Sequence, residues 1–368
     1  MPLFLPRNAQ LWLPGLLSSR LRRRLAPRHN HGPTDIFFCI ADHFEPDHGA
    51  ADANVERARV AAWVERYPRL AQRFADADGR PPQHTFFFPE EGYRPELLDA
   101  LAELCRRGFG DVEVHLHHDR DTADAMRERL GRFTETLFHK HGLLRRRGDG
   151  AITFGFVHGN WALDNARPDG KWCGVNNEIT VLLEAGCYAD FTLPAAPDAS
   201  QTRTINSIYY AIDDPARPRS HDFGVPARVG HSAPENALLI LQGPLTFDMR
   251  RRVWWVLPGL ENGALDDTPA HLPAVDRFAS WVDAAVGVDG RPEWVFVKVH
   301  SHGGPEGNAA MLLGPVMEQF HTDINRHFND GKRYRLHYVT AYEMACLVKA
   351  AEAGATGDPM TLLKTALV

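Results

Sequence analysis

The chain has 368 residues, of which 44% are hydrophobic and 24% are charged, and its formal net charge is −6. This composition is typical of a folded globular protein, and the length suits one large domain or two of ordinary size. The mildly acidic balance argues against nucleic acid as the main partner, because neutralising phosphates requires a basic surface. The five cysteines are scattered without a C-x-x-C pair. They give no disulfide framework and no thiolate zinc site of the usual spacing, and we expect a cytoplasmic protein.

Residues 1–33 are expected to form a basic N-terminal arm. Its arginines follow the apolar part and Pro14 interrupts that part, which is not the order of a signal peptide. No run of about 18 apolar residues occurs, so no transmembrane helix is expected. Leu17, Leu21 and Leu25 recur every four residues opposite the arginines, which indicates an amphipathic helix. Such a helix could make peripheral contact with the inner face of an anionic membrane, pack on the domain, or remain disordered in solvent.

Short apolar runs alternate with amphipathic segments over residues 34–350, which we expect to form the main domain. Apolar residues at three- and four-residue spacing predict helices at 55–75, 94–107 and 121–141. Strands that alternate with helices form parallel sheets, and about eight such units indicate an α/β barrel or partial barrel. The stretch 194–234 is expected to be a long inserted loop region, and 351–368 a C-terminal tail. The predicted strands are 35–41, 84–89, 112–117, 152–157, 188–193, 237–242, 294–300 and 335–340.

Polar residues collect directly after several of the predicted strands. In parallel barrels the C-terminal ends of several strands build the active site together. A single polar residue after a strand is easily explained as an ordinary loop residue. Polar residues after several successive strands do not share this explanation easily. Aromatic residues among them suit a sugar, whose apolar face stacks on rings while carboxylates and amides bind its hydroxyl groups. The candidate substrate-binding residues are Glu45, Glu90, His158, Asn160, Trp161 and His302.

The stretch DVEVHLHHDRDT, residues 111–122, places three histidines and three aspartates at the end of one predicted strand. His115 and His117 lie two residues apart and share one face of that strand. Crowded imidazoles need partners, because an unpaired buried polar group costs about 1–3 kcal/mol. A divalent metal is one such partner, since neutral His and ionised Asp both bind zinc. A hydrogen-bonded histidine network, or helix capping by Asp119 and Asp121, is the alternative.

Four short motifs follow one another along the chain: EVHLH at 113–117, LLEAGCYADFTLP at 182–194, FVKVHSHGG at 296–304 and VTAYEMACLV at 339–348, with IADH at 40–43 before them. Their order and spacing resemble the polysaccharide deacetylase family, the metal-dependent carbohydrate esterases. The resemblance implies a distorted (β/α)7-type barrel and a divalent metal, for which zinc is the expected ion. The residues that the resemblance places at the metal are His43, His117 and Asp121, with His115 beside them.

The resemblance also implies catalytic roles for two residues. Asp42 falls on the family's base and His300 on its late catalytic histidine, although a shift of one residue would make Asp42 a metal ligand instead. The chain departs from the family in strand one, which lacks an Asp-Asp pair. It also departs at 156–160, where FVHGN lacks the Arg of the family's third motif.

These features together predict a metal-dependent hydrolase that removes an N- or O-acyl group from a poly- or oligosaccharide by metal-activated water. A glycosidase-like hydrolase on a related barrel is a second interpretation, with its two carboxylates drawn from Glu45, Glu90 and Glu91. A non-catalytic protein that binds polysaccharide or assists its assembly at a membrane is a third. Analysis of bound metal separates the first interpretation from the second, and activity on acetylated sugars separates it from the third.

Overall fold

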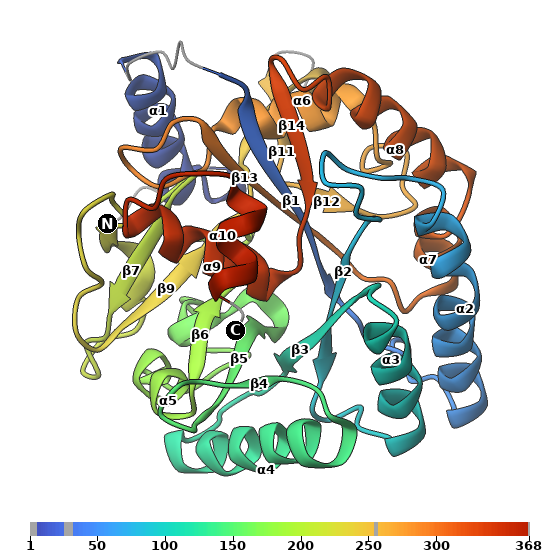
Figure 1. Ribbon diagram of the computed structural model, residues 1–368. Helices are drawn as coiled ribbons and strands as arrows, with labels where there is room; N and C mark the ends of the chain where they lie inside the picture. Colours follow the sequence, from blue (N-terminus) through green and yellow to red (C-terminus); the bar gives the residue numbers. More distant parts are fainter. Residues whose placement is uncertain (1–5, 26–31, 254–256, 367–368) are drawn as a thin grey trace.

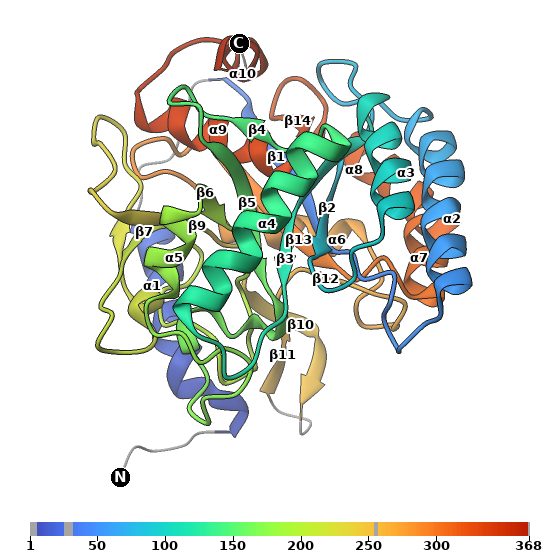
Figure 2. The ribbon, with the colours of Figure 1, turned by 90° about the horizontal axis from the view of Figure 1, so that it is seen from below.

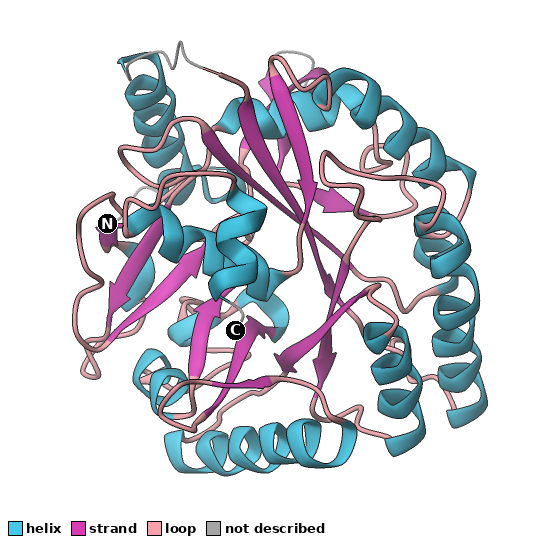
Figure 3. Cartoon of the chain, in the orientation of Figure 1, coloured by secondary structure: helices cyan, strands magenta, loops and turns pink. Residues whose placement is uncertain are grey.

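The computed structural model describes residues 6–25, 32–253 and 257–366 and shows a mixed α/β fold with a large central sheet that helices cover (Figure 1 and Figure 3). The α/β class expected from the sequence is therefore confirmed, whereas closure into a barrel stays a prediction. The helices of four residues or more are α1 (Ala9–Leu25), α2 (Ala53–Ala71), α3 (Pro95–Arg106), α4 (Ala123–His141), α5 (Glu178–Glu184), α6 (Val275–Ala284), α7 (Glu306–Leu312), α8 (Pro315–Phe328), α9 (Ala341–Glu352) and α10 (Pro359–Ala366). The strands are β1 (Thr34–His43), β2 (His84–Pro89), β3 (Gly110–Leu116), β4 (Arg145–Arg146), β5 (Ile152–His158), β6 (Cys187–Asp190), β7 (Ile208–Ile212), β8 (Val225–Pro226), β9 (Ala237–Leu241), β10 (Thr246–Val253), β11 (Leu257–Glu261), β12 (Ala264–Leu265), β13 (Trp294–Ser301) and β14 (Tyr334–Tyr338).

The central sheet has the strand order β12-β13-β1-β2-β3-β5-β6-β9-β7-β8. The strands from β13 to β9 run parallel, and β7 and β8 continue the sheet in antiparallel pairing. Strand β14 lies parallel to the first half of β1, while β2 pairs with its last residues. Among the described residues, no strand pairing joins β13 to β9. The alternation of strands and helices predicted from the sequence is therefore found as a mostly parallel sheet.

Strand β1 shows why the sheet lies in the core, since every residue after Thr34 is buried. Phe37 and Cys39 face one side and pack in a cluster with Phe296 of β13. Ile36 and Phe38 face the other side, in the larger cluster that includes the helices α2, α3 and α8. Apolar residues on both faces are typical of parallel strands that are covered on both sides.

The two ends of the sheet are covered differently. Figure 2 shows α9 and α10 at one end, and α1 with the β10–β11 hairpin at the other. Met360 and Leu363 of α10 are buried in the same cluster as Phe37, so part of the expected C-terminal tail packs on the domain. The expected loop region 194–234 contains β7, β8 and the short helix Ser220–Asp222.

Helix α1 packs on the domain through one face and leaves the other exposed. Trp12 and Leu16 are buried in a small cluster with Ala196 and Leu245, among others. The leucines on the opposite face, Leu17, Leu21 and Leu25, are 54%, 58% and 74% exposed. Packing on the domain, one of the arrangements open from the sequence, is thus observed for α1. Among the described residues, no helix has the length and apolar content needed to cross a membrane.

Candidate metal centre

The parallel register brings the ends of several strands to one edge of the sheet. Ala41 of β1 is level with His300 of β13, and His115 of β3 is level with Val157 of β5. His43 follows Ala41 by two residues and faces the same side. Side chains from these strand ends therefore meet at one edge of the sheet, which is where parallel α/β barrels build their active sites.

Alternation along β1 sends Asp42 and His43 to opposite faces of the sheet. The His43 ring lies 5.2 Å from that of His115, centroid to centroid. The Asp42 carboxylate faces α2 instead, where it accepts hydrogen bonds from Gly303 N at 2.6 Å and from His84 Nε2 at 2.8 Å. Both of its oxygens are engaged there, and the side chain is fully buried. The structure therefore does not bring Asp42 to the strand-end histidines, and the base role expected for it has no support from this placement.

Glu45, His115 and His117 form the group at this mouth that is best suited to hold a metal ion. Glu45 Oε1 lies 3.3 Å from His115 Nε2 and 3.5 Å from His117 Nε2. All three ligand atoms lie within 4.8 Å of one another. Ligands at about 2.0–2.1 Å from a tetrahedral zinc ion are about 3.3–3.4 Å apart. The spacing of this triad therefore fits a zinc-sized ion.

Both imidazoles of the triad are oriented by a second contact. Nδ1 of His115 donates to the carbonyl oxygen of Val157 at 2.9 Å, and Nδ1 of His117 donates to Glu91 Oε1. A neutral imidazole that donates through Nδ1 presents a lone pair at Nε2. Both lone pairs then face the Glu45 carboxylate, which requires a proton or another cation between them. Metal-binding histidines are generally held through their second nitrogen in this way.

The loop that carries Glu45 is fixed from two sides. Arg59 of α2 donates to the carbonyl oxygens of Pro46 at 2.7 Å and His48 at 2.8 Å. On the other side, a Cβ at Gly304 would lie 2.1 Å from the Glu45 carbonyl oxygen, so the loop after β13 can approach this closely only with glycine. The position of the carboxylate is therefore set by the surrounding protein before any ion binds.

Without a metal, the charges at the triad favour a proton between the ligands, which a metal ion would displace. Burial by itself raises the pKa of Glu45, but the hydrogen bond and charge of a protonated His115 outweigh it and bring the pKa down to about 2. Burial lowers the pKa of His117, whereas the hydrogen bond and charge of Glu91 raise it above its usual value. Burial and the neighbouring histidines hold the pKa of His43 well below its usual range, so this imidazole is neutral near pH 7.

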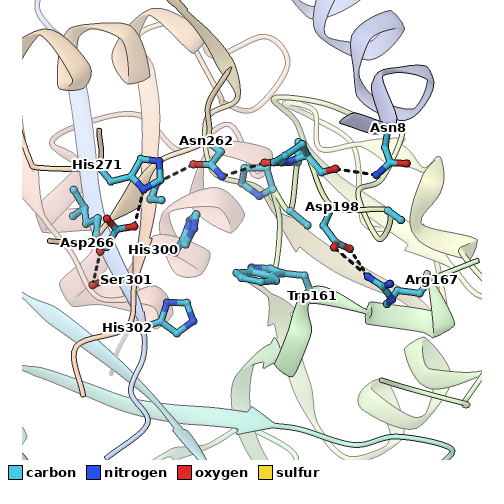
Figure 4. Close-up of a pocket in the computed structure, with 17 residues that line it drawn as sticks. Asn8, Trp161, Arg167, Asp198, Asn262, Asp266, His271, His300, Ser301 and His302 are labelled. Carbon is cyan, nitrogen blue, oxygen red and sulfur yellow. Dashed lines mark hydrogen bonds and ion pairs between the residues drawn. The ribbon is translucent and has the colours of Figure 1, made fainter. Parts of the chain in front are cut away.

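A cleft of about 570 Å³ opens beside the histidines, and His300, His302 and Trp161 point into it (Figure 4). The His302 ring lies 4.9 Å from that of His43, which in turn contacts His115. Trp161 Nε1 and His43 Nε2 are buried and lack a hydrogen-bond partner among the described residues. Imidazoles thus lead from the cleft to the triad. Further polar residues that line the cleft are Asn8, Arg167, Asp198, Asn262, Asp266 and His271.

Asp121 and Glu90, expected as a metal ligand and a substrate-binding residue, lie away from the triad. The Asp121 Oδ2 atom is 3.4 Å from His118 Nδ1. Glu90 forms ion pairs with Arg129 and Arg132 of α4, each at 2.9 Å. Both side chains are engaged with the chain that follows β3, so the structure groups neither of them with the triad.

His158, Asn160 and Trp161, expected to bind substrate, lie at the end of β5 and in the turn that follows it. The His158 side chain is fully buried, with Nε2 3.5 Å from Glu178 Oε1, so it does not reach the cleft. Asn160 and Trp161 both have positive φ, 57° and 56°, in the turn after β5. That turn places the Trp161 ring in the cleft, where the sequence predicted a residue for sugar stacking.

Sequence reasoning assigned Glu45 to substrate binding and gave Glu91 no part in a metal site. The structure places Glu45 in the ligand triad and Glu91 behind His117. The signal available was the position of both residues directly after predicted strands, which indicates an edge of the sheet but not which partner each carboxylate meets.

No protein-family model matches the chain, and neither does any curated protein sequence. The case for a function therefore rests on the geometry at the strand ends.

Proposed function

We propose that the protein is a metal-dependent hydrolase that removes an acyl group from a carbohydrate, with its divalent ion bound by Glu45, His115 and His117. One observation carries the proposal: two imidazoles, each fixed through Nδ1, turn Nε2 toward the same carboxylate oxygen beside a cleft. Three protein ligands beside an open space are typical of catalytic zinc sites, which keep a position for water or substrate. The nitrogen and oxygen ligand set suits zinc among common divalent ions.

A divalent ion in such a site supplies water of lowered pKa and polarises the carbonyl oxygen of the substrate. His43 and His302 lie between the triad and the cleft, so they are placed to accept a proton and return it to the leaving group. Burial lowers the pKa of both residues, and the neutral imidazoles can accept protons near pH 7. His300 also lines the cleft, with its ring 6.0 Å from that of His43, and is the next candidate for this role.

The lining of the cleft supports a carbohydrate as the substrate. Trp161 offers a ring for stacking, and the ion pair of Arg167 with Asp198, at 3.1 Å, adds a polar wall to the cleft. A volume of about 570 Å³ lies within the range of small-ligand sites, about 300–1,000 Å³. The site therefore has room for a short saccharide segment beside the triad.

The glycosidase interpretation has weaker support from the same geometry. It requires two carboxylates that flank the scissile bond across the cleft. Glu45 faces the two imidazoles of the triad, Glu91 accepts from His117, and Glu90 is paired with arginines of α4. None of these three carboxylates is free to act alone on a bond in the cleft.

The proposal is tested by metal analysis together with acetate release from acetylated oligosaccharides. His117→Ala should lose the ion and the activity while the protein stays folded. His139→Ala is the matched control, because His139 is exposed on α4, where it pairs with Glu135 of the same helix. Folded protein that is active without a divalent ion would overturn the proposal. Zinc-loaded protein that binds acetylated oligosaccharides but releases no acetate would indicate a binding protein instead.

A further inference from the structure

A second group of potential metal ligands lies directly behind the first, where solvent does not reach. His118 follows His117 in the chain, and its ring is 4.6 Å from that of His158. With Cys173 and Glu178 these histidines form a group whose ligand atoms all lie within 4.8 Å of one another. His118 is 6% exposed, and the other three residues are 0% exposed. We propose that His118, His158, Cys173 and Glu178 bind a structural zinc ion.

The spacing of the ligand atoms fits a tetrahedral ion. Glu178 Oε1 lies 3.2 Å from His118 Nε2 and 3.5 Å from His158 Nε2. Cys173 Sγ lies 3.3 Å from Glu178 Oε2. Nitrogen and oxygen ligands about 2.0–2.1 Å from zinc are about 3.3–3.4 Å apart, and the longer bond to sulfur widens its separations slightly.

The contacts around the two histidines prepare them as ligands. Nδ1 of His158 donates to the carbonyl oxygen of Gly159, which leaves Nε2 as a lone pair directed at the Glu178 carboxylate. That Nε2 atom is buried and has no hydrogen-bond partner among the described residues. Nδ1 of His118 faces Asp121 Oδ2 at 3.4 Å, the carboxylate–histidine pairing that is common behind metal ligands.

Backbone N–H groups point at the other two ligands, while burial and the charge of Glu178 raise the pKa of the Cys173 thiol, so an ion would displace its proton on binding. Asn165 N and Val175 N lie 3.3 Å and 3.4 Å from Cys173 Sγ and can donate to it, an arrangement that stabilises a thiolate. Asp164 N donates to Glu178 Oε2 at 2.6 Å. One thiolate and one carboxylate carry two negative charges, which a divalent ion neutralises, and a buried charge needs such compensation.

A metal-free network explains this cluster less well. A protonated His118 could donate to Glu178 and Asp121, and the Cys173 thiol could donate to Glu178. No donor then remains for His158 Nε2, and an unpaired buried polar atom costs about 1–3 kcal/mol. A cation at the centre of the four ligand atoms satisfies this nitrogen and the carboxylate at once.

Four protein ligands without access for solvent are typical of structural zinc sites, in contrast to the open triad. The ion would join the end of β3, the end of β5 and the loop that leads to α5. That loop begins with the turn that places Trp161 in the cleft, and His118 is adjacent to the triad ligand His117. This inference goes beyond the proposed function and does not depend on it, because a structural ion would be present whatever the triad does.

Cobalt replacement tests the proposal, because a thiolate ligand gives Co²⁺ a near-ultraviolet charge-transfer band. Protein produced in zinc-depleted medium with added Co²⁺ should show this band, with one ion per chain in the buried cluster and a second if the triad is also occupied. His117→Ala should keep the band with one ion per chain, since the triad contains no cysteine. Cys173→Ser should lose the band, whereas Cys105→Ser, the control on α3, should retain it.

The wild-type spectrum alone can decide the matter if the Cys173 variant does not fold. Folded wild-type protein that binds cobalt without a thiolate band would overturn the proposal. A band that persists in folded Cys173→Ser would do the same, because it would assign the thiolate to another cysteine.

Discussion

Replacing Glu91 with Ala should weaken divalent-metal binding without removing a ligand. Glu91 accepts from Nδ1 of His117 and, at 3.2 Å, from the His117 backbone N–H. The contact fixes the ring and keeps the proton on Nδ1, so that Nε2 is free for the ion. Without it, the imidazole can rotate or carry its proton on Nε2, and both changes reduce the population that can bind.

The expected loss for Glu91→Ala lies at the lower end of the range for such contacts, which is 10- to 100-fold in affinity. The side chains of Glu91 and His117 are each 32% exposed, so water can replace part of the lost hydrogen bond. About tenfold is therefore expected, equivalent to about 1.4 kcal/mol. Glu91→Gln should lose less than Glu91→Ala, because an amide oxygen can still accept from Nδ1.

Zinc dissociation constants from competition with a chelating dye would measure this effect. Glu90 provides the matched control, because it precedes Glu91 in the chain but pairs with Arg129 and Arg132 at 2.9 Å. Glu90→Ala should leave the dissociation constant unchanged. Equal losses in the Glu90 and Glu91 variants, or wild-type affinity in Glu91→Ala, would refute the assignment of the ion to the triad.

Three further predictions concern the cleft histidines, the pH dependence of metal binding and helix α1. His302→Ala should keep the ion and the fold but lower acetate release about 10²–10⁴-fold, with a smaller loss for His300→Ala; unchanged turnover in the former would remove it from proton transfer. Metal affinity should fall as pH drops through the raised pKa of His117, so calorimetric titrations should show binding that weakens from above pH 6.5 downward, and a pH-independent affinity would contradict this. Replacing Leu17, Leu21 and Leu25 of α1 with Ser should abolish co-sedimentation with anionic vesicles without lowering the melting temperature, and a wild-type protein that does not sediment with them would argue against membrane contact.

Much of the fold could be predicted from local sequence patterns, because buried parallel strands have short runs of apolar residues. All eight predicted strands overlap observed strands of the sheet, and the three predicted helices correspond to α2, α3 and α4. The β10–β11 hairpin was not predicted, because its strands carry neither an unbroken apolar run nor a tight-turn sequence.

The candidate sites could be predicted only in part, because their members meet through tertiary contacts. Period-two alternation correctly places His115 and His117 on one face of a strand. The alternation does not tell which residue at the end of β1 faces the histidines of β3. In the structure this residue is His43, while Asp42 faces α2. The buried cluster of His118, His158, Cys173 and Glu178 was harder to predict, because Cys173 lies in a loop and the course of a loop cannot be predicted from the spacing of its apolar residues.

Substitutions of Asp42 can distinguish a catalytic role of this residue from a positioning role. Its carboxylate is fully buried and receives hydrogen bonds from His84 Nε2 and Gly303 N. Gly303 directly follows His302, so Asp42 holds the loop that carries the proposed proton acceptor. Removing one member of a buried, hydrogen-bonded pair typically destabilises a protein by about 3–5 kcal/mol, and Asp42→Ala should lower the free energy of unfolding by this amount.

Asp42→Asn distinguishes the two roles, because an amide keeps one acceptor oxygen but is not a base. The oxygen can still accept from Gly303 N, and His84 can change tautomer to accept from the amide nitrogen. A positioning residue therefore predicts a modest loss of stability in urea unfolding and near-normal acetate release per folded molecule. A catalytic base predicts the opposite: nearly unchanged stability with turnover reduced about 10²–10⁴-fold. Asp42→Asn protein with intact folding and no activity would restore the base role that the family resemblance implies, despite the contacts of Asp42 with His84 and Gly303.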